Sequence, residues 1–212
     1  MRVVTLFLLS LMLSFSLFSQ ERKDVGFTLG SSYYTGDFNP GTPLYSPSPA
    51  FGLLFRYNLS EMYSLRASLV YGGLKGAAPS DSYIPSVKRS FSTSVIGAEA
   101  LFEMNFLKFN TTDHFKNNFA PYVLLGVGGA IVNGKVTPQV PFGVGVKYAL
   151  GGRIAIGAEW KMHKTFSDSI DGYVNPSATS NSIVHNNDWF SFVGLFVTYR
   201  LFNGDFVCPA YR

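Results

Sequence analysis

The sequence has little cysteine, little charge and, after residue 19, no long apolar run. Its single cysteine, Cys208, excludes a disulfide within the chain and any zinc cluster built from cysteines. Charged residues make up 14% of the 212 residues, against about 25% in an average soluble domain. The net charge of +4 is too dilute to predict a polyanionic partner. Disordered chains, coiled coils and most nucleic-acid binders are therefore excluded, and no segment reaches the ~20 apolar residues of a membrane helix.

Aromatic residues and glycine are abundant instead, with 20 Phe, 12 Tyr and 21 Gly. Residues 1–19 predict a signal peptide, because Arg2 precedes an apolar run, Val3–Leu13, and small polar residues follow. We expect cleavage near Ser19–Gln20. An amino-terminal anchor is the alternative, which the charged Glu21–Lys23 segment disfavours. An exported apolar chain without spanning helices is either a soluble β-rich domain or a transmembrane β-barrel.

Alternation of apolar and polar residues decides between these two classes. Residues 153–164 carry apolar side chains at every even position from Ile154 to Met162, and polar or small ones at odd positions. Twelve residues make about 40 Å of strand, whereas strands of soluble proteins usually stop at five or six residues. Similar patterns occupy residues 25–36, 51–59, 63–72, 96–106, 123–131, 142–148 and 188–202. The sequence predicts an all-β fold, an eight-stranded antiparallel transmembrane β-barrel of the outer membrane, over residues 20–202.

The polar faces of these strands predict the barrel interior. Their many Gly and Ala residues suit the narrow lumen of an eight-stranded barrel. Buried charges must pair or stay hydrated, so we interpret the ionisable residues as an ionic plug, with a conducting pore as the alternative. The predicted plug comprises Arg56, Arg66, Glu99, Glu103, Lys147, Glu159, Lys161 and Arg200, and Arg153 shares the same face.

The connections alternate in length, as in outer-membrane barrels with short periplasmic turns and long outer loops. Residues 60–62 and 151–152 predict tight turns, and 37–49, 76–90, 133–141 and 165–187 predict long loops. The segment 108–121 falls on the short-turn side and yet is long. Residues 203–212 would form a periplasmic tail. Two aromatic girdles are predicted: Tyr57, Tyr63, Tyr148 and Tyr199 on the inner side, and Tyr33, Tyr71, Trp160 and Trp189 on the outer side.

Several motifs along the mature chain carry a family resemblance. They are Ser32–Pro40, Phe55–Asn58, Pro141–Tyr148, Glu159–Trp160, Thr165–Gly172, Asn187–Phe190 and Thr198–Arg200, followed by Cys208 and Tyr211. In their order and spacing the chain resembles the PorG-like small outer-membrane barrels of the type IX secretion system in the Bacteroidetes. The resemblance implies a barrel in the outer membrane of a Gram-negative bacterium that anchors a periplasmic ring of secretion proteins.

The histidines and acids do not predict an enzyme. Glu159 and His163 share a strand face but lie about 13 Å apart along it, too far for a base and its orienting partner. His114 and His185 fall on turns. A calcium site at Asp168, Asp171 and Asp188 is the alternative reading of an acidic turn region, although their spacing matches no calcium loop. We therefore expect no enzymatic activity, no cofactor and no metal.

Two functions stand after this reading. The first is a non-enzymatic barrel that docks periplasmic or outer-membrane secretion proteins. We also expect it to contact membrane lipid and not to bind nucleic acid. The residues expected to contact the partner are Lys108, Asp113, His114, Lys116, Cys208 and Tyr211. A lone Cys208 in an oxidising compartment predicts either an intermolecular disulfide or an exposed thiol. The second function is a barrel that binds or transports a small solute or a surface ligand.

Overall fold

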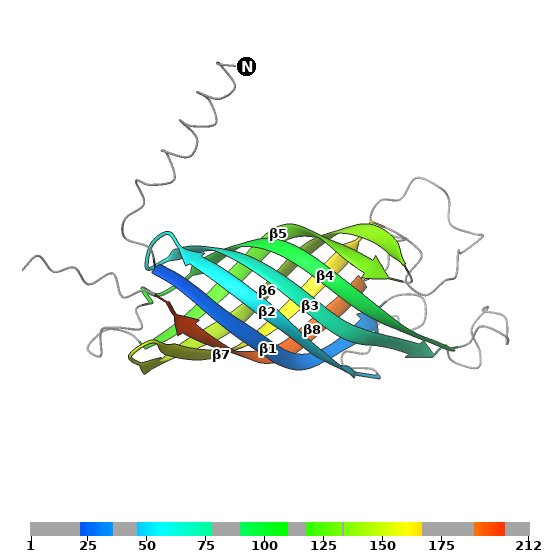
Figure 1. Ribbon diagram of the computed structural model, residues 1–212, viewed down its shortest axis with the longest axis horizontal. Coiled ribbons are helices and arrows are strands. Elements are labelled where there is room, and N and C mark those ends of the chain that lie inside the picture. The colour runs from blue at the N-terminus through cyan, green and yellow to red at the C-terminus, as the bar shows by residue number, and fades with distance from the viewer. Residues whose placement is uncertain are drawn as a thin grey trace, which may run out of the picture.

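The computed structural model describes residues 22–35, 46–77, 90–109, 118–132, 134–166 and 189–201. Within these ranges the chain forms eight β-strands, each antiparallel to the next, and β8 pairs with β1 to close a barrel (Figure 1). Their bounds are β1 (Arg22–Thr35), β2 (Ser48–Asn58), β3 (Tyr63–Ala77), β4 (Ser90–Asn105), β5 (Phe119–Val132), β6 (Lys135–Gly151), β7 (Ile154–Thr165) and β8 (Trp189–Arg200). The predicted fold class is confirmed.

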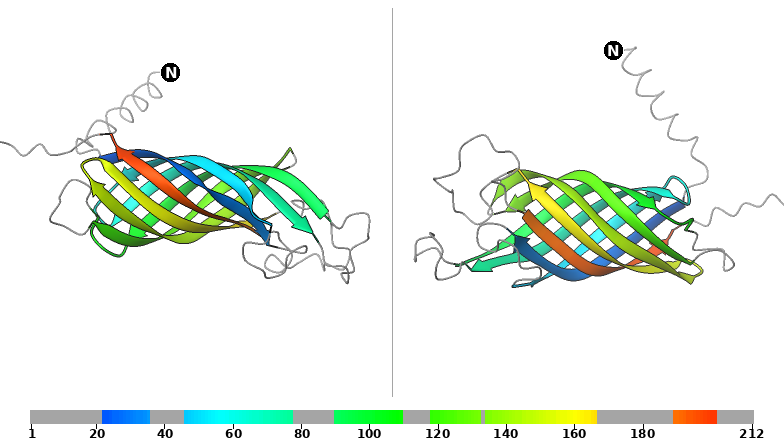
Figure 2. Two further views of the ribbon diagram at one scale, coloured as in Figure 1. Left: turned by 90° about the horizontal axis from the view of Figure 1, so that it is seen from below. Right: turned by 180° about the vertical axis from the view of Figure 1, so that it is seen from behind.

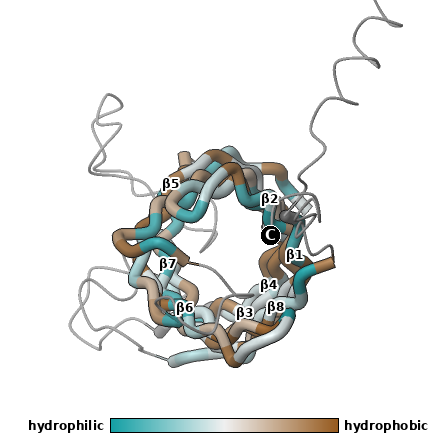
Figure 3. Tube along the Cα trace, turned by 90° about the vertical axis from the view of Figure 1, so that its left-hand side faces the viewer, coloured by the Kyte–Doolittle hydropathy of each residue, from teal (hydrophilic) through white to brown (hydrophobic). Residues whose placement is uncertain are grey.

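The strands are long and tilted, and end-on they form a complete ring (Figures 2 and 3). β2 is the shortest with 11 residues and β6 the longest with 17, which is enough to cross a bilayer when tilted by about 45°. None of the described residues belongs to a helix long and apolar enough to span a membrane.

Side chains alternate between the two faces of the barrel wall. In β2 each buried residue from Ser48 to Arg56 is followed by an exposed or half-exposed one. The outward residues are apolar, such as Leu53 and Leu195 with 64% and 66% of their surface exposed. The inward residues include most of the buried charges. This is the reverse of a soluble protein, and it is the arrangement of a barrel whose outer wall contacts lipid.

The two turns that the sequence predicts to be tight lie at the end of the barrel where β1 begins and β8 ends. In the β2–β3 turn, the Ser60 hydroxyl accepts hydrogen bonds from the backbone N–H groups of Met62 and Tyr63, at 3.2 and 3.0 Å. In the β6–β7 turn, Gly151 and Gly152 have φ angles of 102° and 64°, which L side chains rarely adopt. Both turns occur where the sequence predicts them.

The predicted long loop over residues 133–141 is wrong, because β6 already begins at Lys135. Val132 pairs directly with Lys135, so residues 133–134 make the whole connection, and Gly134 has a φ of 76°. Pro138 lies within β6, although proline cannot donate a backbone hydrogen bond to a neighbouring strand. Its carbonyl accepts a bond from the Phe166 N–H, at 3.1 Å. The backbone nitrogen of Pro138 therefore points toward the end of β7, where the hydrogen bonds between β6 and β7 stop, so no strand bond is lost there.

Two further differences concern the end of the barrel where β1 begins. The first strand begins at Arg22 rather than at Val25, which brings Asp24 into the barrel. The expectation that Arg153 points inward is wrong. It is exposed in the β6–β7 turn, and its Nη1 lies 3.4 Å from the Tyr199 hydroxyl. The predicted signal peptide, the tail and most of the predicted loops 37–49, 76–90 and 165–187 lie outside the described residues.

Most predicted girdle residues lie toward an end of their strand, but Tyr71 and Trp160 lie in the middle of β3 and β7. At the turn end, Tyr63, Tyr148 and Tyr199 are exposed on the outer wall. The Trp160 indole N–H donates to the Tyr33 hydroxyl at 3.1 Å, and at the other end the Lys164 ammonium lies 5.1 Å from the centre of the Trp189 ring.

Candidate functional site

The barrel interior gathers ionisable side chains from strands that are distant in the sequence. All eight residues predicted for the ionic plug are buried there. Two further buried ionisable residues are not among the predicted plug residues: Asp24, which precedes the predicted first strand, and His163, which the sequence places on the same face as Glu159. Among these side chains, five cations face four carboxylates, a formal charge of +1 with His163 neutral.

Glu103 on β4 is the centre of the largest group. Its carboxylate accepts hydrogen bonds from Arg56 Nε at 2.8 Å and Nη2 at 3.2 Å, and from Lys147 Nζ at 2.6 Å. Arg66 Nη1 lies 3.2 Å from the same carboxylate. One carboxylate thus joins β2, β3, β4 and β6 across the lumen.

Arg66 extends this group to β7. Its Nη1 and Nη2 donate to the two carboxylate oxygens of Glu159, at 2.6 and 3.0 Å. The Tyr122 hydroxyl also donates to Glu159, at 3.1 Å. A bidentate pair of this kind fixes both position and orientation.

A second group surrounds Glu99. Lys161 Nζ donates to its Oε2 at 3.0 Å, and His163 Nε2 lies 2.7 Å from its Oε1. From the sequence, Glu159 on the same strand is excluded as a partner of His163, because the two residues are too far apart along the strand. The carboxylate that His163 contacts comes from β4 instead, since the closed sheet brings β4 and β7 to opposite sides of a narrow lumen.

A third group lies at the β1–β8 seam. Asp24 accepts from Arg200 Nε at 3.1 Å and from Asn58 Nδ2 at 2.8 Å, and Arg56 Nη1 is 3.8 Å away. Because Arg56 also contacts Glu103, the seam and the central group are continuous.

Aromatic rings pack against the interior cations. Arg56 and Arg66 lie 5.6 and 6.0 Å from the centre of the Phe196 ring, and Lys147 lies 4.3 Å from that of Tyr122. These are distances at which a ring face attracts a cation. The inward Phe residues of β8 are therefore part of the charged interior.

Apolar side chains close the interior at both ends. At the loop end, the buried cluster is Tyr34, Leu74, Val95, Ala130, Val132 and Phe190. At the turn end it is Phe109, Ala120, Ala149 and Ala155. Charged and apolar layers therefore alternate along the lumen.

Phe109 belongs to the long connection between β4 and β5. Its side chain is buried in the turn-end cluster, and its backbone N–H donates to the Glu61 carbonyl at 3.1 Å. Asn105 Nδ2 donates to the same carbonyl, also at 3.1 Å. This connection is thus fastened to the β2–β3 turn, and the neighbouring Leu107 and Lys108 are exposed.

Lys108 is the predicted partner-binding residue that the structure describes. Asp113, His114, Lys116, Cys208 and Tyr211 lie outside the described residues, as do the calcium candidates Asp168, Asp171 and Asp188. In the described part of the chain, no three His, Cys, Asp or Glu side chains come together as metal ligands would.

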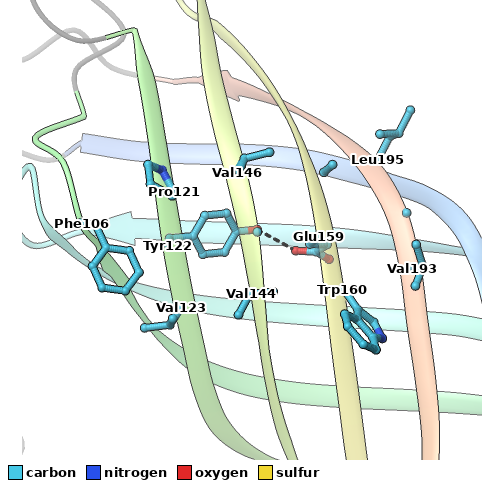
Figure 4. Close-up of a pocket in the computed structure, with 13 residues that line it drawn as sticks. Phe106, Pro121, Tyr122, Val123, Val144, Val146, Glu159, Trp160, Val193 and Leu195 are labelled. Carbon is cyan, nitrogen blue, oxygen red and sulfur yellow. Dashed lines mark hydrogen bonds between the residues drawn. The ribbon is translucent and has the colours of Figure 1, made fainter. Parts of the chain in front are cut away.

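A shallow hollow of about 580 Å³ lies on the outer wall over β5–β8 (Figure 4). Val123, Val144 and Val193 line it, together with Gly145 and Gly194. Figure 4 shows that Tyr122 and Glu159, which meet in a hydrogen bond, lie among its lining residues. The hollow belongs to the apolar outer wall, where lipid chains would fill it.

The closed eight-stranded fold and its apolar outer surface together define the class of protein, a β-barrel of the outer-membrane type. The family model described as "Domain of unknown function (DUF6089)" matches residues 2–210, and the chain belongs to that family. No curated protein matches the sequence.

Solved structures of small outer-membrane barrels are similar to this chain in fold. Neisserial surface protein A (NspA) is 14% identical with a TM-score of 0.50, and the match covers 84% of this chain and 96% of that one. Ail, the attachment invasion locus protein of Yersinia pestis, is 13% identical with a TM-score of 0.47, over 85% and 98%. The outer membrane enzyme PagL is 14% identical with a TM-score of 0.43, over 83% and 98%. At these identities the similarity concerns the fold.

Proposed function

We propose that this barrel lies in the outer membrane of a Gram-negative bacterium of the Bacteroidetes. There it would act without enzymatic activity in the type IX protein secretion system, where it anchors a periplasmic ring of secretion proteins. Its sequence motifs resemble PorG-like barrels, and its filled interior suits an anchor. We take the end that carries the β2–β3 and β6–β7 turns as the periplasmic end, because outer-membrane barrels have short periplasmic turns.

The observation that carries the proposal is the fastened β4–β5 connection. At its start this connection is held in place, because the Phe109 side chain is buried in the barrel end and the Phe109 N–H donates to the Glu61 carbonyl. Both contacts hold Leu107 and Lys108 at a fixed place on the periplasmic end. A long connection where barrels usually have short turns, with its described start fastened to the barrel, supports a binding role.

Transport of a small solute is the alternative function. The interior disfavours it, because a solute would have to separate two apolar clusters and several buried ion pairs. Binding of a ligand by the outer loops is a separate form of the alternative, and the crosslinking experiment below tests it.

Site-specific photo-crosslinking in the native host tests the docking proposal. A photo-reactive residue at Lys108 should crosslink to a periplasmic component of the type IX machinery. Val136 is the matched control, because it is exposed but lies at the loop end of β6. Crosslinks to the secretion component from Val136 but not from Lys108 would move the partner to the other side and contradict the proposal.

Two variants test the consequence for secretion. Deletion of residues 110–117, which keeps Phe109, should leave a folded barrel that no longer co-purifies with the ring component and no longer supports export of its cargo. Cys208→Ser should remove any higher-mass band on a gel run without reductant. Normal secretion and intact partners in both variants would refute docking through these segments.

A further inference from the structure

A row of inward-facing residues crosses four neighbouring strands in the loop-side half of the lumen. Ser68 pairs with Glu99, Glu99 with Gly128, and Gly128 with Gln139. Direct neighbours in register lie about 5 Å apart, so this row is continuous around nearly half of the barrel. Because Gly128 has no side chain, the side chain of Gln139 can lie over it. Gln139 Nε2 is 3.3 Å from the position that a Cβ of Gly128 would take.

Gln139 has no hydrogen-bond partner in the described part of the chain, although its side chain is almost completely buried. It is 2% exposed, and both Nε2 and Oε1 are unpartnered. A buried amide normally finds a partner, since leaving it dry costs free energy. Its Nε2 lies 3.3 Å, and Glu99 Oε1 3.9 Å, from the position that a Cβ of Gly97 would take, so the amide and the carboxylate border the same space.

His163 presents a second unpartnered atom to the same half of the lumen. Its Nε2 contacts Glu99, its ring stacks on Phe190 at a centroid distance of 4.3 Å, and its Nδ1 has no partner among the described residues. The side chain is 0% exposed. The Ser68 hydroxyl, next to Glu99 in the row, is also buried without a partner.

The charges and the layers around these atoms restrict what could bind them. The carboxylate of Glu99 is already paired with Lys161, so the group offers no net charge to an ion. The apolar loop-end cluster, which includes Tyr34, Leu74 and Phe190, separates the group from the barrel mouth. The occupant must therefore be small, neutral and able both to donate and to accept hydrogen bonds.

We propose that the loop-side half of the lumen is an internal hydration site, in which bound water bridges Gln139, His163 and Ser68. Water meets all three requirements, and buried water typically makes about three hydrogen bonds to polar groups that lack other partners. The site would join β3, β6 and β7 around Glu99. This inference does not depend on the docking function.

A high-resolution crystal structure of the full mature chain tests the proposal directly. Ordered water should lie within hydrogen-bond distance of Gln139 Nε2 or Oε1 and of His163 Nδ1. Density that leaves both side chains dry would overturn the proposal, as would density for an ion or an organic molecule in that place.

A substitution gives an independent readout. Gln139→Met keeps the length of the side chain and removes its polar atoms. If water bonds to the Gln139 amide, the variant removes that water's partner. The thermal unfolding midpoint of the variant in detergent should then fall. Leu124→Met, in an apolar layer of the neighbouring strand, is the matched control and should change little. A midpoint that rises or stays with Gln139→Met would mean that the amide is dry and unsatisfied, and the proposal would fail.

Discussion

Removal of the Glu103 charge should destabilise the barrel more than any other single change in the interior. The Glu103 side chain is fully buried and serves Arg56, Arg66 and Lys147 at 2.6–3.2 Å. Glu103→Gln keeps the shape but leaves three cations with one fewer carboxylate. Breaking a buried ion pair by removing one partner costs about 3–5 kcal/mol, and we expect a loss in that range.

The magnitude can be separated from packing by two further variants. Leu101→Met, two residues away on β4 and equally buried, changes shape without charge and should cost less than about 1.5 kcal/mol. Glu103→Gln combined with Lys147→Met removes one charge of each sign and restores the formal balance of the interior. This double variant should recover much of the stability that the single variant loses.

Urea unfolding of the refolded barrel in lipid vesicles measures these differences. The fluorescence of Trp160 and Trp189, the 2 Trp of the chain, and the gel mobility of unboiled samples give two readouts of the same transition. If Glu103→Gln unfolds at the same urea concentration as Leu101→Met, the central ion group does not stabilise the fold and the reasoning is refuted.

Three other expectations follow from the described geometry. Leu69 is 56% exposed on the outer wall, so Leu69→Arg should cost about 2–4 kcal/mol of stability near the bilayer midplane. The neighbouring Ser68 faces inward, so Ser68→Arg should instead destabilise the barrel by crowding the lumen. If Leu69→Arg refolds into lipid as the wild type does, the assignment of faces is contradicted. Phe109→Ala should destabilise the turn end by about 3–5 kcal/mol, which the same urea curves would detect, and no loss would mean that the β4–β5 connection is not fastened there. The wild-type barrel should show no ion conductance in planar bilayers, because its lumen is filled; regular conductance steps would favour the transport alternative.

The fold could be predicted from the sequence because alternation is a local property. The run from Ile154 to Met162 identifies its own outer face without knowledge of any other strand. The same rule placed all eight plug residues on inward faces. It failed at residues 133–141, where a polar stretch indicated a loop although β6 already begins at Lys135.

The partners within the interior could not be predicted in the same way. Which carboxylate meets His163 depends on strand register and on the closure of β8 against β1, and neither is visible in one strand. Asp24 was missed for a related reason: the first apolar residue of the pattern is Val25, so the polar residue before it looked like the end of the strand. Faces are local, whereas contacts across the lumen depend on the whole barrel.

The interior also bears on where this protein can meet a partner. Its buried carboxylates and cations bond one another, and its outer wall is apolar and suited to lipid. Polar recognition is then left to the two ends of the barrel. At the turn end, Phe109 links the two regions, because its side chain closes the lumen while its backbone fixes the segment that exposes Lys108. Packing of the barrel and the position of the proposed docking segment therefore depend on the same residue, and a variant that loosens Phe109 should weaken both together.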